Sequence, residues 1–306
     1  MTLNLQGKVG IVTGAGRGIG AAIAKLLAAE GAAVVVNDVG VTIDGQAGGD
    51  RPADEVVAGI RAAGGQAAAN FDSVADWNGA FAMVEQAVTT FGRLDFVVNN
   101  AGIVRDIMFH KMSESDWDAV INVHLKGTFC VCRAAAERFR AQGSGAIVNM
   151  TSTSGLIGNL GQANYAAAKL GIVALTRSIA IDMQRFGVRA NAVAPFAWTR
   201  MTATIPTSDD PKQQARIERL KQMSPEQIAP LVAFLVADSA KDVNGQVFAV
   251  RGTEISLFSL PAPKRALHRA GGWNVESLAE MLPETLRRDF VPLLVTGDVF
   301  GYPPLL

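Results

Sequence analysis

The sequence predicts an α/β fold: a doubly wound, parallel, seven-stranded sheet with helices on both faces, followed by a C-terminal extension. Short apolar runs alternate along the chain with longer segments of helical periodicity. Strands that alternate with helices pair in parallel and place helices on both faces of the sheet. The run Ala-Val-Val-Val-Asn at 33–37 is apolar through Val36 and rich in β-branched residues, as in strands buried on both faces.

The elements follow one another regularly. Strands are predicted at 9–13, 33–37, 66–70, 96–99, 146–150, 189–194 and 246–250. Helices are predicted at 19–29, 54–63, 77–91, 116–141, 165–186 and 225–237. We expect residues 1–252 to form one domain. Residues 253–306, with a weak helical pattern at 275–288, are too few for a second domain of usual size. This extension is expected to pack on its own core or on a neighbouring subunit.

Composition excludes several function classes. The 306 residues contain 28 Lys plus Arg and 28 Asp plus Glu, so no net charge attracts nucleic acid or an anionic membrane. No apolar run approaches the roughly 20 residues of a membrane helix. Cys130 and Cys132 point in different directions on a predicted helix, which favours buried free thiols and a reducing compartment. Metal-ligand spacing is not apparent. We expect a soluble, cytoplasmic protein without a metal site.

The stretch 152–169 carries the candidate chemistry. Tyr165 and Lys169 are four residues apart at the start of a predicted helix, so both side chains emerge on one face. A tyrosine hydroxyl has an ordinary pKa of about 10, and a neighbouring ammonium group lowers it. Such a tyrosine removes a proton from an alcohol or returns one to a carbonyl. Ser152, at the end of the preceding strand, can hold the reacting oxygen by a hydrogen bond.

A glycine-rich segment joins the first predicted strand to the first helix. It reads Thr-Gly-Ala-Gly-Arg-Gly-Ile-Gly over 13–20. Glycines let the backbone approach a pyrophosphate, and the helix N-terminus supplies amides. Asp38 ends the second strand, where a carboxylate accepts hydrogen bonds from adenosine ribose and repels a 2′-phosphate. NAD is therefore favoured over NADP, although Arg17 is a cation that could partly restore NADP binding.

Together with Asn99-Asn100-Ala101-Gly102, these motifs resemble the short-chain dehydrogenase/reductase family over residues 5–252. The resemblance implies a Rossmann-like dinucleotide-binding catalytic domain, hydride transfer between a nicotinamide and a carbon bearing oxygen, and a homodimer or homotetramer. It assigns Tyr165 as the base, Ser152 to orient substrate, and Lys169 to grip the nicotinamide ribose. The cofactor-binding residues that it implies are Gly14, Arg17, Gly18, Ile19, Asp38, Asp72, Ser73, Asn100, Ala101, Gly102, Tyr165, Lys169, Pro195 and Thr199.

A narrower resemblance points to one branch of the family. The segments Val123-His124-Leu125-Lys126-Gly127 and Gly161-Gln162-Ala163-Asn164-Tyr165 look like the (3R)-hydroxyacyl-CoA dehydrogenase domain of peroxisomal type 2 multifunctional enzymes and its bacterial relatives. This implies oxidation of 3-hydroxyacyl-CoA to 3-oxoacyl-CoA with NAD. His124 falls where the family usually has an asparagine that supports a water near the lysine. Either it relays protons, titrating near pH 6.5, or it only packs there.

Three other functions stay open at this point. Two are enzymatic: a dehydrogenase of steroids or other secondary alcohols, and a reductase of 3-oxoacyl carrier proteins. The third, from another class, is a non-catalytic dinucleotide-binding protein. The intact set of Ser152, Tyr165 and Lys169 argues against the third, because a pure binding protein needs none of their proton chemistry.

Overall fold

The computed structural model describes residues 5–46, 49–199 and 211–306. Its centre is one sheet with the strand order β3-β2-β1-β4-β5-β6-β7-β8. The strands are β1 (Val9–Thr13), β2 (Ala33–Asn37), β3 (Gln66–Asn70), β4 (Phe96–Asn99), β5 (Gly145–Met150), β6 (Val188–Phe196), β7 (Val247–Arg251) and β8 (Glu254–Leu257). Neighbouring strands from β3 to β7 pair in parallel, and β8 pairs antiparallel with β7.

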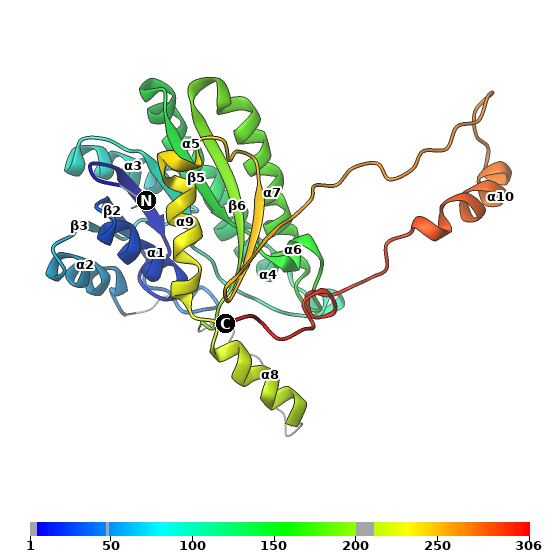
Figure 1. The fold of residues 1–306 in the computed structure, drawn as a ribbon, viewed down its shortest axis with the longest axis horizontal. Helices are drawn as coiled ribbons and strands as arrows, with labels where there is room; N and C mark the ends of the chain where they lie inside the picture. The colour runs from blue at the N-terminus through cyan, green and yellow to red at the C-terminus, as the bar shows by residue number, and fades with distance from the viewer. Residues whose placement is uncertain (1–4, 47–48, 200–210) are drawn as a thin grey trace.

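Helices cover both faces of this sheet, as Figure 1 shows. The α-helices of the described residues are α1 (Gly18–Ala29), α2 (Pro52–Ala62), α3 (Trp77–Phe91), α4 (Glu114–Ile121), α5 (Gly127–Gln142), α6 (Thr153–Leu156), α7 (Ala163–Met183), α8 (Pro211–Lys221), α9 (Ala229–Val236), α10 (Val275–Leu286) and α11 (Thr296–Val299). The predicted doubly wound α/β fold is confirmed. None of the described helices is long and apolar enough to cross a membrane.

Alternate residues of each central strand feed two separate cores. On β2, Val34 and Val36 pack in a cluster with α1, α2 and α9, whereas Ala33 and Val35 pack in a second cluster with α3 and α5. Successive strand side chains point to opposite faces, so a strand covered on both sides is apolar on both faces over most of its length. The continuous runs in the sequence are therefore the cause of the two-faced packing.

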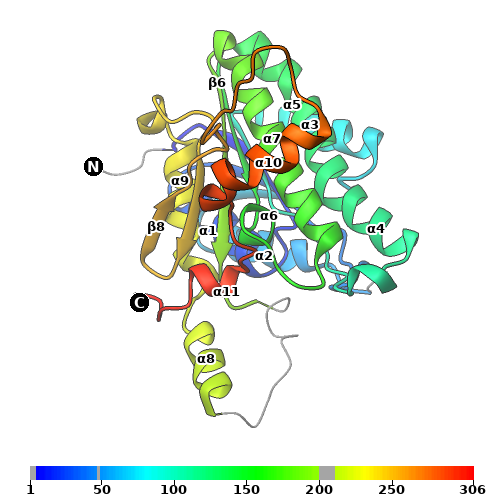
Figure 2. The ribbon, with the colours of Figure 1, turned by 90° about the vertical axis from the view of Figure 1, so that its right-hand side faces the viewer.

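The structure contains two short helices, α6 and α11, that were not predicted, and it differs from the sequence prediction in three larger features. The sheet has an eighth strand, β8, because the chain turns at Gly252 and pairs back along the edge strand β7. The single helix predicted at 116–141 is divided into α4 and α5 by a π-helical turn, Asn122–Lys126. Helix α8 lies in a stretch for which no element was predicted, and it projects from the body in both views (Figures 1 and 2).

The C-terminal extension leaves the body and then returns to it. In Figure 1, α10 stands apart at the end of a long extended segment. Further on, Thr296 donates its backbone N–H to the carbonyl of Gly158, 3.0 Å away. The N–H of Thr253 bonds to the carbonyl of Leu305, and the guanidinium of Arg251 bonds to the carbonyl of Tyr302. The last residues thus close over the carboxyl ends of β6 and β7.

Candidate active site

The glycine-rich loop after β1 is shaped by backbone positions that only glycine fills. Gly14 has φ +59°, and a Cβ there would lie 2.6 Å from Cα of Ala101. A Cβ on Gly20 would lie 2.3 Å from the carbonyl oxygen of Gly14. Separations this short do not occur between real atoms, so any side chain would force the loop open. Gly20 was not among the predicted cofactor-binding residues, yet it has as little room for a side chain as Gly14.

Asn100 fastens this loop to the end of β4. Its Nδ2 donates to the carbonyls of Thr13 at 3.1 Å and Gly14 at 2.9 Å. The hydroxyl oxygen of Thr13 accepts the backbone N–H groups of Asn100 and Ala101 at 3.0 and 3.1 Å. These four bonds join the carboxyl ends of two adjacent strands, where a doubly wound sheet binds its ligand.

The carboxylate of Asp38 lies beside the same loop. Its Oδ2 accepts the N–H of Gly16 at 3.0 Å, and its Oδ1 accepts the N–H of Gly40 at 2.8 Å. Arg17 is paired elsewhere, with its Nη2 2.7 Å from a carboxylate oxygen of Asp50. The two side chains that bear on the choice between NAD and NADP are therefore both held in defined positions.

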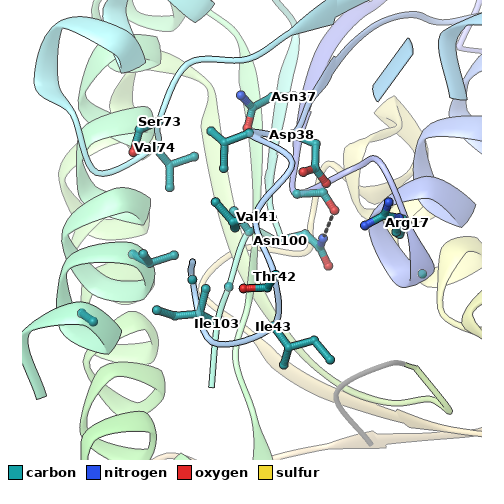
Figure 3. A pocket seen from close by; sticks show the side chains of 18 of the residues that line it. Arg17, Asn37, Asp38, Val41, Thr42, Ile43, Ser73, Val74, Asn100 and Ile103 are labelled. Atoms are coloured by element: carbon teal, nitrogen blue, oxygen red, sulfur yellow. Dashed lines mark hydrogen bonds between the residues drawn. The ribbon is translucent and has the colours of Figure 1, made fainter. Parts of the chain in front are cut away.

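A cavity of about 470 Å³ opens between these segments (Figure 3). It is the right size for part of a large ligand, since ligand pockets usually measure about 300–1,000 Å³. The structure places ten of the predicted cofactor residues in its wall: Gly14, Arg17, Gly18, Ile19, Asp38, Ser73, Asn100, Ala101, Gly102 and Thr199.

Four predicted cofactor residues lie outside this wall: Asp72, Tyr165, Lys169 and Pro195. Tyr165 and Lys169 belong to the group of reaction residues that β5 and α7 bring together. Asp72 is turned toward β3, where Nδ2 of Asn70 donates to its Oδ2 at 2.8 Å. Pro195 stands in the body of β6, opposite Val250 of β7. Their assignment to the cofactor stays a prediction.

The segment that follows Asp38 also lines the cavity, and none of its residues was among the predicted site residues. Val41 and Ile43 face the cavity (Figure 3), and the carbonyl of Ile43 accepts the N–H of Val104 at 3.0 Å. Nε of Arg105 donates to the carbonyl of Asp44 at 3.1 Å. The signal was present in the sequence, because Val39, Val41 and Ile43 alternate in an otherwise polar, glycine-rich loop.

The reaction residues gather where β5 meets α7. Ser152 caps the short helix α6, and its oxygen accepts the N–H of Ser154 at 3.1 Å while its side chain is hydrogen-bonded to Tyr165. Lys169, which is 4% exposed, donates from Nζ to the carbonyl of Met150 at 2.7 Å. Its Nζ lies 5.5 Å from the centre of the Tyr165 ring.

Burial shifts the protonation of this pair. The pKa of Tyr165 is raised to about 12, chiefly because the side chain is removed from water; the bond to Ser152 lowers it, and the charge of Asp106 raises it. The pKa of Lys169 is lowered to about 7 by burial. We expected the lysine to lower the pKa of the tyrosine, and that expectation is wrong for the protein alone. Desolvation opposes both charged forms, so the neutral lysine and the neutral tyrosine are favoured.

His124 lies directly against this pair, on the π-helical turn between α4 and α5. Its ring meets Tyr165 edge-on, with centres 5.1 Å apart. Nε2 lies 2.7 Å from the carbonyl of Ile103, and Nδ1 is buried with no partner within the described structure. Burial, together with the charge of Lys169, lowers the pKa of His124 to about 3. The expected titration near pH 6.5 is therefore wrong, and the imidazole stays neutral.

The family model described as enoyl-(acyl carrier protein) reductase matches residues 14–252, from the glycine loop through the end of β7. The chain belongs to the short-chain dehydrogenase/reductase family. As an enzyme of this family it is an oxidoreductase of hydroxyl and keto groups that uses a nicotinamide cofactor. The non-catalytic reading is thereby set aside, and the resemblance drawn from the sequence is confirmed.

Individual relatives narrow the comparison. The chain is 48% identical over 256 residues to a short-chain type dehydrogenase/reductase of Mycobacterium tuberculosis, covering 84% of this chain and 86% of that one. It is 43% identical over 290 residues to hydroxyacyl-CoA dehydrogenase ChsB1 of the same organism, covering 92% of this chain and 89% of that one. With peroxisomal multifunctional enzyme type 2 of Mus musculus it shares 46% identity over 248 residues, which are 81% of this chain and 32% of the mouse protein.

A solved structure agrees over almost the whole length. The crystal structure of a short chain dehydrogenase from Mycobacterium avium matches with a TM-score of 0.83 and 44% identity. The match covers 97% of this chain and 100% of that one, so the similarity includes the C-terminal extension.

The residues present in this chain fit a dinucleotide. Gly14 and Gly18 have positive φ, and neither Gly14 nor Gly20 has room for a Cβ, so the glycine loop is a tightly turned cradle of backbone. The cradle opens at the N-terminus of α1, where backbone amides favour a pyrophosphate. Asp38 lies in the cavity wall beyond it.

Proposed function

We propose that the protein oxidises 3-hydroxyacyl-CoA to 3-oxoacyl-CoA with NAD. The observation that carries the proposal is the group of Ser152, Tyr165 and Lys169, which His124 connects to Gly102 in the cavity wall. The chain is also similar to hydroxyacyl-CoA dehydrogenase ChsB1 over nine-tenths of its length. A bound nicotinamide would supply the hydride acceptor. The remaining work, which is to bind the alcohol oxygen and take its proton, falls to side chains of this chain.

In this mechanism Ser152 and Tyr165 hold the substrate oxygen, and Tyr165 takes its proton. The pair of Tyr165 and Lys169 has room for that proton only after it has lost one of its own, which happens as pH rises through the Lys169 pKa of about 7. In the protein alone the singly protonated pair is a neutral tyrosine beside a neutral lysine. When the tyrosine proton passes to the lysine, the resulting phenolate accepts the proton of the alcohol. Oxidation then leaves the pair with two protons, and reduction runs the same steps backward.

NAD is the proposed cofactor because Asp38 lies in the cavity wall with a carboxylate already ordered by two backbone amides. A carboxylate accepts hydrogen bonds from a ribose diol and repels a 2′-phosphate. The nearby cationic side chain of Arg17 is paired with the carboxylate of Asp50, so its positive charge is offset.

The test is a direct assay of the full-length protein. It is mixed with NAD or NADP and with 3-hydroxyacyl-CoA thioesters, matched acyl carrier protein thioesters, and steroid and simple secondary alcohols, while reduced nicotinamide absorbance is followed. The proposal requires the highest kcat/KM with a hydroxyacyl-CoA and NAD. Faster turnover of a carrier-protein thioester, to which the name of the matching family model points, would replace it with a reductase. Turnover of steroids alone would replace it with a steroid dehydrogenase.

A homo-oligomer, either a dimer or a tetramer, is proposed from exposed apolar side chains on outer helices. Phe129 on α5 and Leu170 and Ile181 on α7 are 43%, 48% and 62% exposed. Isolated apolar residues are normal at a surface, but three large ones on neighbouring helices suggest an interface. The variant Leu170→Glu/Ile181→Glu should lower the mass measured by light scattering, whereas Glu137→Gln, a surface change on α5, should not. An unchanged mass in the double variant would remove this face of α7 from the interface.

We keep two further assignments as proposals. The division into a catalytic domain at 1–252 and an extension at 253–306 is supported by the end of the family match at residue 252. The buried free thiols of Cys130 and Cys132 support a reducing compartment such as the cytoplasm.

A further inference from the structure

The cavity wall holds two side chains with opposite preferences for the adenosine ribose. Asp38 suits a ribose with two free hydroxyls, whereas the guanidinium of Arg17 suits a ribose that carries a 2′-phosphate. Figure 3 shows both beside the same glycine loop. The balance between the two cofactors therefore depends on whether Arg17 can turn toward a phosphate.

Arg17 already forms an ion pair with Asp50. Its Nη2 lies 2.7 Å from Oδ2 of Asp50, within hydrogen-bond distance of a charged partner. Asp50 does not line the cavity itself. Any influence that Asp50 has on the cofactor must therefore pass through Arg17.

Asp50 is held at this place by the backbone around it. Its carbonyl oxygen lies only 2.2 Å from the position that a Cβ on Gly40 would occupy. The backbone at Asp50 is therefore in close contact with the backbone at Gly40. Two residues later, the buried Pro52 begins α2 and packs on Gly16, where a Cβ would lie 2.7 Å from its ring. The carboxylate thus stands on a junction anchored to both the glycine loop and the turn after Asp38.

We infer that Asp50 is a second determinant of cofactor choice, a positioning residue that engages the Arg17 guanidinium so that a 2′-phosphate must break an ion pair to reach it. The inference rests on the proposed preference for NAD. Asp38 repels the phosphate, and Asp50 withholds the cation that would attract it. Because Arg17 and Asp50 are 35% and 71% exposed, water and salt screen the pair, and its share of the discrimination is modest.

The experiment measures dissociation constants of NAD and NADP by titration calorimetry on the full-length protein, with no substrate. Asp50→Asn should tighten NADP binding about three- to fivefold, the range that an exposed ion pair allows, and should leave NAD within about twofold. Arg17→Gln/Asp50→Asn should lose that gain. The matched control is Asp54→Asn, which removes the same charge from the first turn of α2, where Asp54 pairs with Arg51 and not with Arg17.

Each outcome has one reading. An equal gain in Asp54→Asn would assign the effect to net charge and overturn the role of Asp50, as would no gain in Asp50→Asn. The single variant Arg17→Gln is a second test that keeps Asp50 in place. It should leave NADP binding within about twofold of the parent, and a larger loss would show that Arg17 already reaches the phosphate. A parent that binds NADP more tightly than NAD would defeat the proposed cofactor, separately from these comparisons.

Discussion

The cofactor end and the reaction end of the site adjoin each other but are built on different physical grounds. At the cofactor end, hydrogen bonds to backbone groups hold the glycine loop and Asp38. The side-chain amide of Asn100 donates to the carbonyl of Gly14, and the backbone N–H of Gly16 donates to the carboxylate of Asp38. At the reaction end, Tyr165, Lys169 and His124 are titratable groups whose pKa values burial moves away from their ordinary range.

This difference indicates what each end contributes. A surface of satisfied backbone groups recognises the shape of its ligand. Buried groups with displaced pKa values are costly to keep, and such groups collect where protons are transferred. Changes at the cofactor end should therefore alter binding, and changes at the reaction end should alter turnover. The predictions below test that division.

The largest effect is expected from Tyr165→Phe. The phenyl ring keeps the packing but cannot accept or return a proton, so turnover should fall about 10²- to 10⁴-fold. NAD affinity, measured by calorimetry, should remain near that of the parent. A variant that retained half of the parental kcat would show that another group is the base.

A smaller effect is expected from Asp38→Ala, and it should appear in binding. Loss of the carboxylate removes charge-assisted bonds to a ribose and the repulsion of a 2′-phosphate, so the ratio of kcat/KM for NAD over NADP should narrow by about tenfold. Asp38→Asn is the matched control, because an amide oxygen can still accept one of the N–H groups of Gly16 or Gly40. A kcat with NAD that fell as far as in Tyr165→Phe would break the division between the two ends.

How far the sequence predicts this molecule follows the same division. The fold and the glycine loop are readable because backbone constraints act locally: a two-faced strand must be apolar, and a crowded turn must be glycine. The state of Lys169 and His124 was not readable, because desolvation depends on everything packed around a side chain. Strand β8 was missed for a related reason, since Glu254–Leu257 is short and only its pairing with β7 defines it.

The smallest kinetic effect is expected from His124→Asn, an amide that can still bond to Ile103. Turnover should change by less than about tenfold. The pH–rate profile should keep the parental acidic limb, because a histidine with a pKa of about 3 does not titrate in the working range. If this substitution shifted the acidic limb, the hypothesis that His124 relays protons and titrates near neutral pH would be supported after all.

His124→Phe gives a contrasting result. It removes the ring nitrogen that bonds to the backbone of Ile103, and a buried polar group left without a partner costs about 1–3 kcal/mol. Thermal unfolding should therefore shift downward in this variant, together with any loss of turnover. An unchanged melting temperature would mean that the Ile103 contact contributes nothing to stability.

The central claim is that the Tyr165–Lys169 pair accepts the substrate proton, and that burial of Lys169 sets the pH at which the pair can do so. The most direct test is kcat/KM against pH in both directions with saturating cofactor. Because the pair loses its first proton as pH rises through the Lys169 pKa of about 7, oxidation should rise through that pH to a plateau. Reduction, which needs the doubly protonated pair, should fall over the same interval. Rates in both directions that stayed flat from about pH 5.5 to 9, well to either side of that transition, would contradict the account.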